Sequence, residues 1–254
     1  MERIGLRWAA FILALVAAGS IEQAAAAEVT LLSTLAAHSV VEKVRSGFEQ
    51  KTGHHLVVKF DTAAGLKRDI ESGIKFDAFL LTKDASTALE GAGKLPRGRS
   101  RSFAVVLLGL AAKEGDSVPD ISTSEKLVAA LLGAQKISYA REGASGQSFM
   151  RSLEAHAMVE PLAQKLVPMP ASATIEAVAA GDVTYGVQLI SEIVSVKGAK
   201  LIGPLPAEYQ SSTQLTMGCA SDPCAPAPAA LIEFLSSREA ADAIAAAGMV
   251  VPQQ

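Results

Sequence analysis

The stretch HLVVKFDTAAGLKRDIESGIKFDAFLLT (55–82) holds two apolar runs on either side of a short amphipathic segment. The apolar runs are rich in β-branched and aromatic residues, which predicts two strands. Leu66 and Ile70 lie four positions apart and Gly73 follows them, which predicts a short helix between the strands. Strand–helix–strand units of this length form right-handed crossovers between parallel strands. The stretch therefore predicts an α/β fold with helices covering a sheet.

The same alternation continues along the rest of the chain and forms two α/β units of similar size. Two apolar segments, 103–112 and 199–220, are long enough to carry the chain from one unit to the other and back. We expect strands at 28–34, 55–60, 76–82, 103–112, 136–140, 164–170, 183–190, 199–206 and 211–220, and helices at 38–53, 66–73, 84–93, 123–134, 143–158, 171–181 and 227–248.

Composition allows a large core and argues against a nucleic-acid partner. The chain has 254 residues, of which 50% are hydrophobic, and a net charge of −3. No long basic run is present, so no binding to nucleic acid is expected. The sequence also contains no nucleotide-binding fingerprint and no set of metal ligands, so no cofactor and no metal are expected.

The N-terminus has the features of a secretory signal peptide. Arg3 and Arg7 precede a short apolar run, and Ala25–Ala27 offers a small-residue cleavage site. We predict a signal peptide over residues 1–27, cut before Glu28, and a mature protein in the periplasm that does not insert into the membrane. The alternative is an anchor that is retained, but the apolar run is shorter than the ~20 residues of a membrane span.

Both cysteines lie in the segment CASDPC (219–224). In an exported protein, two cysteines this close and separated by a turn-forming Asp–Pro pair predict a disulfide between Cys219 and Cys224. A metal site is the weaker interpretation because no histidine or carboxylate cluster accompanies the two thiols. Two free thiols are the remaining alternative.

Four predicted strand-to-helix turns are built from alanine, glycine, serine and threonine. Their sequences are STLAAHS (33–39), DTAAG (61–65), EGASGQS (142–148) and PASAT (170–174). A helix N-terminus has unpaired N–H groups and a partial positive charge, and small side chains let an anion reach it. Any single one of these turns is explained better by ordinary helix capping than by a binding site. Four in one α/β chain, at the strand ends where such folds bind ligands, predict a cleft for a small anion.

The segment from VTLLSTLAAHS to FDAFLLT (29–82) and the tail LIEFLSSREAADAIAAAGM (231–249) are similar to periplasmic solute-binding proteins of ABC transporters, in the molybdate-binding branch. The resemblance covers nearly the whole predicted mature chain. It implies a type II periplasmic-binding fold: two lobes, each a mostly parallel sheet flanked by helices, joined by two hinge strands. It implies lobe I at 28–105 and 209–254, lobe II at 106–208, an inner-membrane ABC permease as partner, and a monomer.

The resemblance also indicates where the ligand binds. Serine donors of molybdate binders fall here at Ala36 and Ala63, and a tyrosine hydroxyl falls at Leu189, so three side-chain donors are replaced by apolar residues. Arg141 would suit a carboxylate through paired hydrogen bonds, or it is an exposed loop arginine. This favours an organic di- or tricarboxylate over molybdate. The remaining predicted binding residues are Thr34, His38, Thr62, Ser145, Gly146, Ser172 and Gln188.

Of Lys67 and Arg68, in the first turn of the predicted second helix, we expect one to face solvent. His38 also has an alternative interpretation, as a residue on the surface of its helix.

An enzyme is the alternative to a binding protein. Aconitate isomerase resembles the same branch, and it shifts a proton to move a double bond within a tricarboxylate. Such a reaction needs groups that hold the anion and one base near an acidic C–H bond. His38 or Glu142 would be that base here, without a cofactor. A binding protein remains the favoured interpretation.

Overall fold

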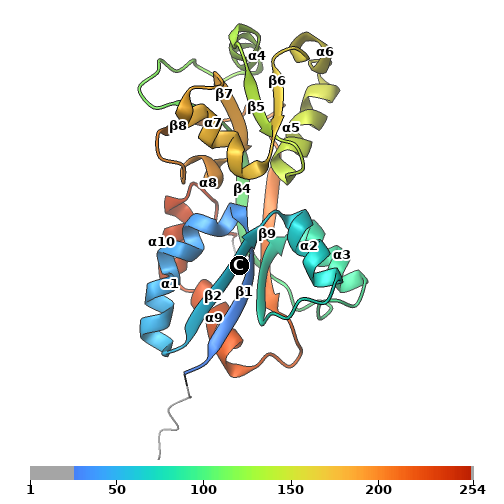
Figure 1. Cartoon of the computed structure of the whole chain (residues 1–254), viewed down its shortest axis with the longest axis vertical. Helices are drawn as coiled ribbons and strands as arrows, with labels where there is room; N and C mark the ends of the chain where they lie inside the picture. The colour runs from blue at the N-terminus through green and yellow to red at the C-terminus, as the bar shows by residue number, and fades with distance from the viewer. Residues whose placement is uncertain (1–25, 253–254) are drawn as a thin grey trace, which may run out of the picture.

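The computed structural model describes residues 26–252 and contains two lobes stacked along its long axis (Figure 1). The predicted signal peptide lies outside the described residues except for its last two positions. Within 26–252, no helix has the length and hydropathy that a bilayer crossing requires.

Lobe I has a parallel three-stranded sheet continued by an antiparallel strand. The order is β2–β1–β3–β9, in which β1 pairs in parallel with β2 and β3, and β3 pairs antiparallel with β9. Its elements are β1 (Glu28–Thr34), η1 (Leu35–Ala37), α1 (His38–Thr52), β2 (His55–Asp61), α2 (Ala63–Glu71), β3 (Ala78–Thr82), α3 (Lys83–Gly91), β9 (Ser212–Cys219), α9 (Pro226–Leu235) and α10 (Arg238–Ala246).

Two apolar layers cover the faces of the lobe I sheet. Because side chains alternate along a strand, Leu31 packs in the layer with α1 and Leu32 packs in the layer with α2 and α3. Phe48 of α1 packs edge-on against Phe234 of α9, with ring centroids 5.7 Å apart. The C-terminal helices therefore complete lobe I, and α1 and α10 lie side by side there (Figure 1).

Lobe II repeats the arrangement with its own parallel strands. Here β5 pairs in parallel with β6 and β7, and β7 and β8 pair antiparallel with β4. Its elements are α4 (Ser124–Gly133), β5 (Ile137–Ala140), α5 (Ala144–Ala155), α6 (Val159–Leu162), β6 (Leu166–Met169), η2 (Ala171–Ala173), α7 (Thr174–Ala180), β7 (Tyr185–Leu189), α8 (Ile190–Ile193) and β8 (Ala199–Pro204).

The strand β4 (Arg101–Lys113) belongs to both sheets. It pairs with β9 up to Leu107 and with β7 and β8 from Leu108 onward, so it runs through the junction between the lobes (Figure 1). The predicted return segment 199–220 is two strands, β8 and β9, separated by a turn. The α/β class and the two-lobed type II architecture are confirmed. The lobe boundaries at 105/106 and 208/209 remain a prediction.

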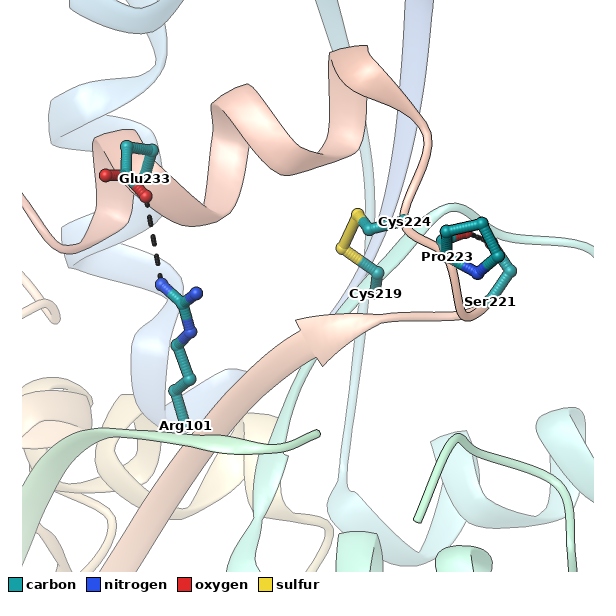
Figure 2. Close-up of a disulfide and its surroundings, with 6 residues drawn as sticks. All are labelled: Arg101, Cys219, Ser221, Pro223, Cys224 and Glu233. Atoms are coloured by element: carbon teal, nitrogen blue, oxygen red, sulfur yellow. Dashed lines mark hydrogen bonds and ion pairs between the residues drawn. A yellow bond between two sulfur atoms is a disulfide. The ribbon is translucent and has the colours of Figure 1, made fainter. Parts of the chain in front are cut away.

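The predicted disulfide is present. Cys219 at the end of β9 is bonded to Cys224, just before α9 (Figure 2). The loop that it closes also carries Asp222, which forms an ion pair with Arg99 at 2.9 Å. The disulfide therefore crosslinks a short loop at the outer end of lobe I. It lies at the end of β9 that is away from the junction with lobe II.

Candidate functional site

The carboxyl ends of the parallel strands of both lobes face each other across a cleft. Three adjoining cavities form it: a main cavity of about 460 Å³, a second cavity of about 240 Å³ and an inner cavity of about 30 Å³. All three are lined by Leu35 of lobe I and Ala171 of lobe II, so they are parts of one cleft. The residues of all four small-residue turns contribute to its walls.

At three of the four strand-to-helix turns, the helix N-terminus has no side-chain cap. The helices η1 and α1 begin after Thr34 and Ala37, α5 begins after Gly143, and η2 begins after Pro170, and in each case no side chain accepts a hydrogen bond from the first-turn N–H groups. Their N–H groups therefore remain available for a ligand. Ordinary capping by a side chain does not explain these three sequences.

The turn at 61–65 is different, because the side chains of its own residues accept hydrogen bonds from N–H groups at the start of the helix. The Thr62 hydroxyl caps α2 by accepting a hydrogen bond from the Gly65 N–H at 3.0 Å. The Asp61 carboxylate accepts from the Thr62 N–H at 2.6 Å and lies where a side chain on Gly65 would be. Gly65 is thus small to admit Asp61, whereas Ala63 lines the inner cavity.

Two arginines from opposite lobes line the main cavity. Arg68 comes from α2 and Arg141 from the turn after β5, and both are exposed. Within residues 26–252, neither guanidinium has a carboxylate within 4.0 Å, and the Arg141 guanidinium donates only to the Pro168 carbonyl, at 3.3 Å. The neighbouring Lys67 instead pairs with Glu71 at 2.6 Å on the helix surface. Arg68 and Arg141 are therefore positioned to bind an anion from both sides.

Hydroxyl groups line the inner cavity. Thr34 is 3% exposed, and its hydroxyl has no hydrogen-bond partner among the described residues. Thr62 and Thr82 accept hydrogen bonds from Gly65 and Ala85 N–H groups through their oxygens, which leaves each hydroxyl proton available to donate. A cavity of about 30 Å³ has room for one or two oxygen-sized groups. It is suited to a single oxygen-bearing group of a ligand.

Ser145 and Gln188 support each other on the lobe II side. The Ser145 hydroxyl donates to the Gln188 side-chain oxygen at 2.8 Å, and the Gln188 amide donates to the Ala171 carbonyl at 3.1 Å. Both side chains are buried. These bonds hold the N-terminal ends of α5 and η2 together, so both residues help to shape the cleft wall.

The second cavity contains titratable groups from both lobes. His38 of α1 is exposed and lies 4.5 Å from the Phe60 ring, centroid to centroid. Glu176 and Glu192 come from α7 and α8. Removal from water, and secondly the charge of Glu176, raises the pKa of Glu192 to about 8. Glu192 keeps some contact with solvent through the cleft, and its raised pKa favours the protonated carboxyl group at neutral pH.

Most predicted binding residues line this cleft. Arg141, Glu142 and Ser172 line the main cavity, His38 and Gln188 the second cavity, and Ala36, Ala63, Ser145 and Leu189 the inner cavity, as do Thr34 and Thr62. Gly146 does not line any of the three. It packs α5 onto β5, because a side chain there would overlap the Ala140 carbonyl oxygen.

Sequence reasoning did not single out several of the lining residues, among them Arg68, Thr82 and Glu192. The i,i+4 pairing of Lys67 with Glu71 was a signal that Arg68 was the residue left for the cleft. Thr82 ends a strand directly before a helix, as Thr34 does, and Thr62 lies between β2 and α2. Glu192 lies three residues after the end of β7 and is the acidic residue of α8. Across 26–252, no group of three or more histidine, cysteine or acidic side chains is arranged to hold a metal ion.

Two α/β lobes joined by a shared strand, with a polar cleft at their facing strand ends, define a type II periplasmic-binding fold. The chain belongs to the bacterial extracellular solute-binding proteins, whose family model matches residues 29–250.

Individual relatives have different roles. An aconitate isomerase from Pseudomonas sp is 27% identical over 241 residues, which is 91% of this chain and 92% of that protein. The Azotobacter vinelandii periplasmic molybdate-binding protein is 19% identical, with a TM-score of 0.72 over 89% of this chain and all of that one. The substrate-binding domain of a putative molybdenum ABC transporter from Clostridium difficile is 17% identical, with a TM-score of 0.69 over 90% and 100%. At these identities, the two structural similarities establish the fold only.

Proposed function

We propose that this protein is a periplasmic solute-binding protein that captures a small organic anion carrying at least two carboxylate groups for an ABC importer. The ligand enters the open cleft, contacts both lobes, and favours the state in which they close around it. Membership of the solute-binding family supports capture and delivery as the role. The lining of the cleft supports the class of ligand.

The observation that carries the proposal is the pair of arginines. Arg68 and Arg141 reach the same cavity from different lobes, and neither is neutralised by an acidic neighbour within 4.0 Å in the described chain. Guanidinium groups bind carboxylates through two parallel hydrogen bonds, which gives geometric specificity. A ligand that bridges them links the lobes, and this provides the differential affinity that closure requires.

The size and donor set of the cleft favour a polycarboxylate over a tetrahedral oxyanion. A main cavity of about 460 Å³ lies in the range of small-molecule sites. The inner cavity accepts only one or two oxygen-sized groups, so a second anionic group of the same ligand would remain near the arginines. A tetrahedral oxyanion is too compact to occupy both places.

Acidic residues also line the main cavity, and they limit which anions fit. Asp61 is held by the Thr62 N–H, and Glu142 is exposed at the rim. The cleft therefore attracts a ligand through directed donors rather than through a net positive charge. Such a site discriminates by the spacing of the carboxylates.

Calorimetric titration with tricarballylate, citrate, succinate, molybdate and sulfate tests the proposal. We expect a tricarboxylate to bind most tightly and to raise the melting temperature. Arg68→Gln and Arg141→Gln should each weaken binding by about 10–100-fold, since each removes a hydrogen bond between charged groups. Lys67→Gln, next to Arg68 but paired with Glu71, is the matched control and should bind normally. Tight binding of molybdate alone would contradict the polycarboxylate.

An isomerase acting on a tricarboxylate is the second candidate function. It is supported by the 27% identity to the Pseudomonas aconitate isomerase over nearly the full length of both chains. It is also supported by His38 and Glu142, two proton-transfer groups that line the cleft. Both lie beside cavities that also contain the anion-binding groups, as a proton shift requires.

Ultraviolet absorbance distinguishes the two functions directly. An isomerase converts cis- to trans-aconitate without added cofactor, whereas a binding protein returns its ligand unchanged. His38→Gln and Glu142→Gln should then abolish conversion while tricarballylate binding persists, because tricarballylate has no double bond to move. No conversion by the wild-type protein at stoichiometric concentration would reject the isomerase.

A further inference from the structure

Glu192 lies where the two lobes meet. It belongs to α8, which follows β7 directly and packs closely on β4, because Gly109 has no side chain to meet Ile190 and Ile193. The same helix contacts η1 and α1 of lobe I. Glu192 lines both the second cavity and the inner cavity. Its carboxyl group is therefore next to any ligand group that enters the inner cavity.

Few charged groups surround this carboxyl. Glu176 of α7 and His38 of α1 share the second cavity with it, and η1 contributes no titratable residue. On β4, the titratable residue nearest along the strand is Lys113, four residues beyond Gly109 and about 13 Å away along the strand. Lys200 of β8 is exposed, and Tyr185 begins β7 at the strand end away from α8. No lysine or arginine lines the second or inner cavity to stabilise an ionised Glu192.

The inner cavity has another group that lacks a partner. The Thr34 hydroxyl is almost completely buried, is unpaired within residues 26–252, and lines the same cavity as Glu192. An unpaired buried polar group is costly, so it points to a ligand atom that completes its hydrogen bonding. Together, Thr34 from lobe I and Glu192 from lobe II line one space that fits an oxygen.

We propose that one carboxylate of the bound ligand enters the inner cavity and accepts hydrogen bonds from the Glu192 carboxyl group and the Thr34 hydroxyl, so that ligand capture is linked to a proton on Glu192. This inference rests on the proposed anion-binding function. A neutral carboxyl acts as a donor, whereas an ionised one only accepts hydrogen bonds and repels the anion.

The linkage has a defined direction. Burial raises the pKa of Glu192 to about 8, so the donor is present at neutral pH and is lost as the pH rises through that value. Below that value, affinity is constant. Above it, affinity falls tenfold for each pH unit, because binding must first return one proton to the protein.

Titration of tricarballylate between pH 7 and 9.5 tests this, because all its carboxyl groups are already ionised in that window. Wild-type affinity should be flat to about pH 8 and then fall tenfold per unit. Glu192→Gln keeps an N–H donor without a titrating proton, so its affinity should be flat throughout and exceed that of the wild type by at least tenfold at pH 9.5. At pH 8.5, calorimetry in buffers of different ionisation enthalpy should show uptake of about 0.8 protons per ligand by the wild type and none by the variant.

The alternatives give different results. A decline that persists in Glu192→Gln but disappears in His38→Gln assigns the proton to His38 and overturns the inference. Binding that is flat with pH in the wild type overturns the inference and leaves the proposed function intact. If no carboxylate binds at pH 7 to either protein, the proposed function fails and the inference fails with it.

Discussion

Replacing Glu192 by glutamine should stabilise the protein in a pH-dependent manner, even without ligand. In the folded protein, burial raises the pKa of Glu192 from its ordinary value of 4.5 to about 8. In the unfolded chain the group ionises near its ordinary value. Between these two values, unfolding therefore releases a proton, and the wild-type protein loses stability as the pH rises.

The size of the effect follows from the width of this window. Each pH unit contributes 1.36 kcal/mol per differing proton, so a window of 3.5 units sets an upper limit of about 5 kcal/mol. Partial contact with solvent through the cleft reduces the value, because hydration lowers the cost of ionising the group. We expect the free energy of unfolding of Glu192→Gln, relative to the wild type, to rise by about 2–4 kcal/mol between pH 5 and pH 8 and then to level off.

Urea unfolding of both proteins at half-unit pH intervals measures this difference. Contributions from all other titrating groups cancel in the comparison of the two proteins. Glu176→Gln removes only the smaller of the two causes of the shift, so it should retain most of the wild-type slope. A difference between Glu192→Gln and the wild type that does not change from pH 5 to pH 8 would refute a buried, neutral Glu192.

Three further predictions concern packing and the cleft. Gly146→Ala should destabilise the fold by about 3 kcal/mol in a thermal melt, because its methyl group would overlap the last carbonyl of β5; Gly91→Ala, with open space around it, should be neutral or slightly stabilising. Replacing Cys219 and Cys224 together by serine should cost about 2 kcal/mol and about 4–8 °C, the value for a small loop, and should leave ligand affinity unchanged because the bond lies far from the cleft. Thr34→Val should not lower stability, since the lost hydroxyl is buried and unpaired, but should weaken tricarballylate binding about tenfold in calorimetry.

The regular elements could be predicted because their patterns are long. The strand 28–34 has the observed bounds, and the predicted helix 38–53 ends one residue early, at a left-handed Gly53. The short helix α8 was missed because four residues are too few to show a helical period. Its contacts with β4 and α1 are tertiary, and the local sequence does not encode them.

The cleft was predictable as a place but not as a charge distribution. Small residues in the strand-to-helix turns indicated the position of the cleft, because parallel strands bring their carboxyl ends to one edge of the sheet. Which of Lys67 and Arg68 faces that edge depends on a rotation of about 100° around α2. The raised pKa of Glu192 depends on how much water and how many cations the fold leaves near it, and no pattern in the sequence expresses that quantity.

The hydroxyl donors of the inner cavity show why aligned positions are a poor guide to ligand class in this fold. The resemblance placed apolar residues at Ala36, Ala63 and Leu189, where molybdate binders have three side-chain donors. In the folded chain, Thr34 and Thr62, each one or two residues earlier, line the inner cavity beside Ala36 and Ala63. A strand end and a helix start lie close together in space, so a donor can move by a residue or two along the turn and still reach the same cavity. The chemistry of such a cleft is therefore conferred by the set of groups that converge on it, and a protonated carboxyl from lobe II is a substitute for a hydroxyl only while the pH keeps its proton in place.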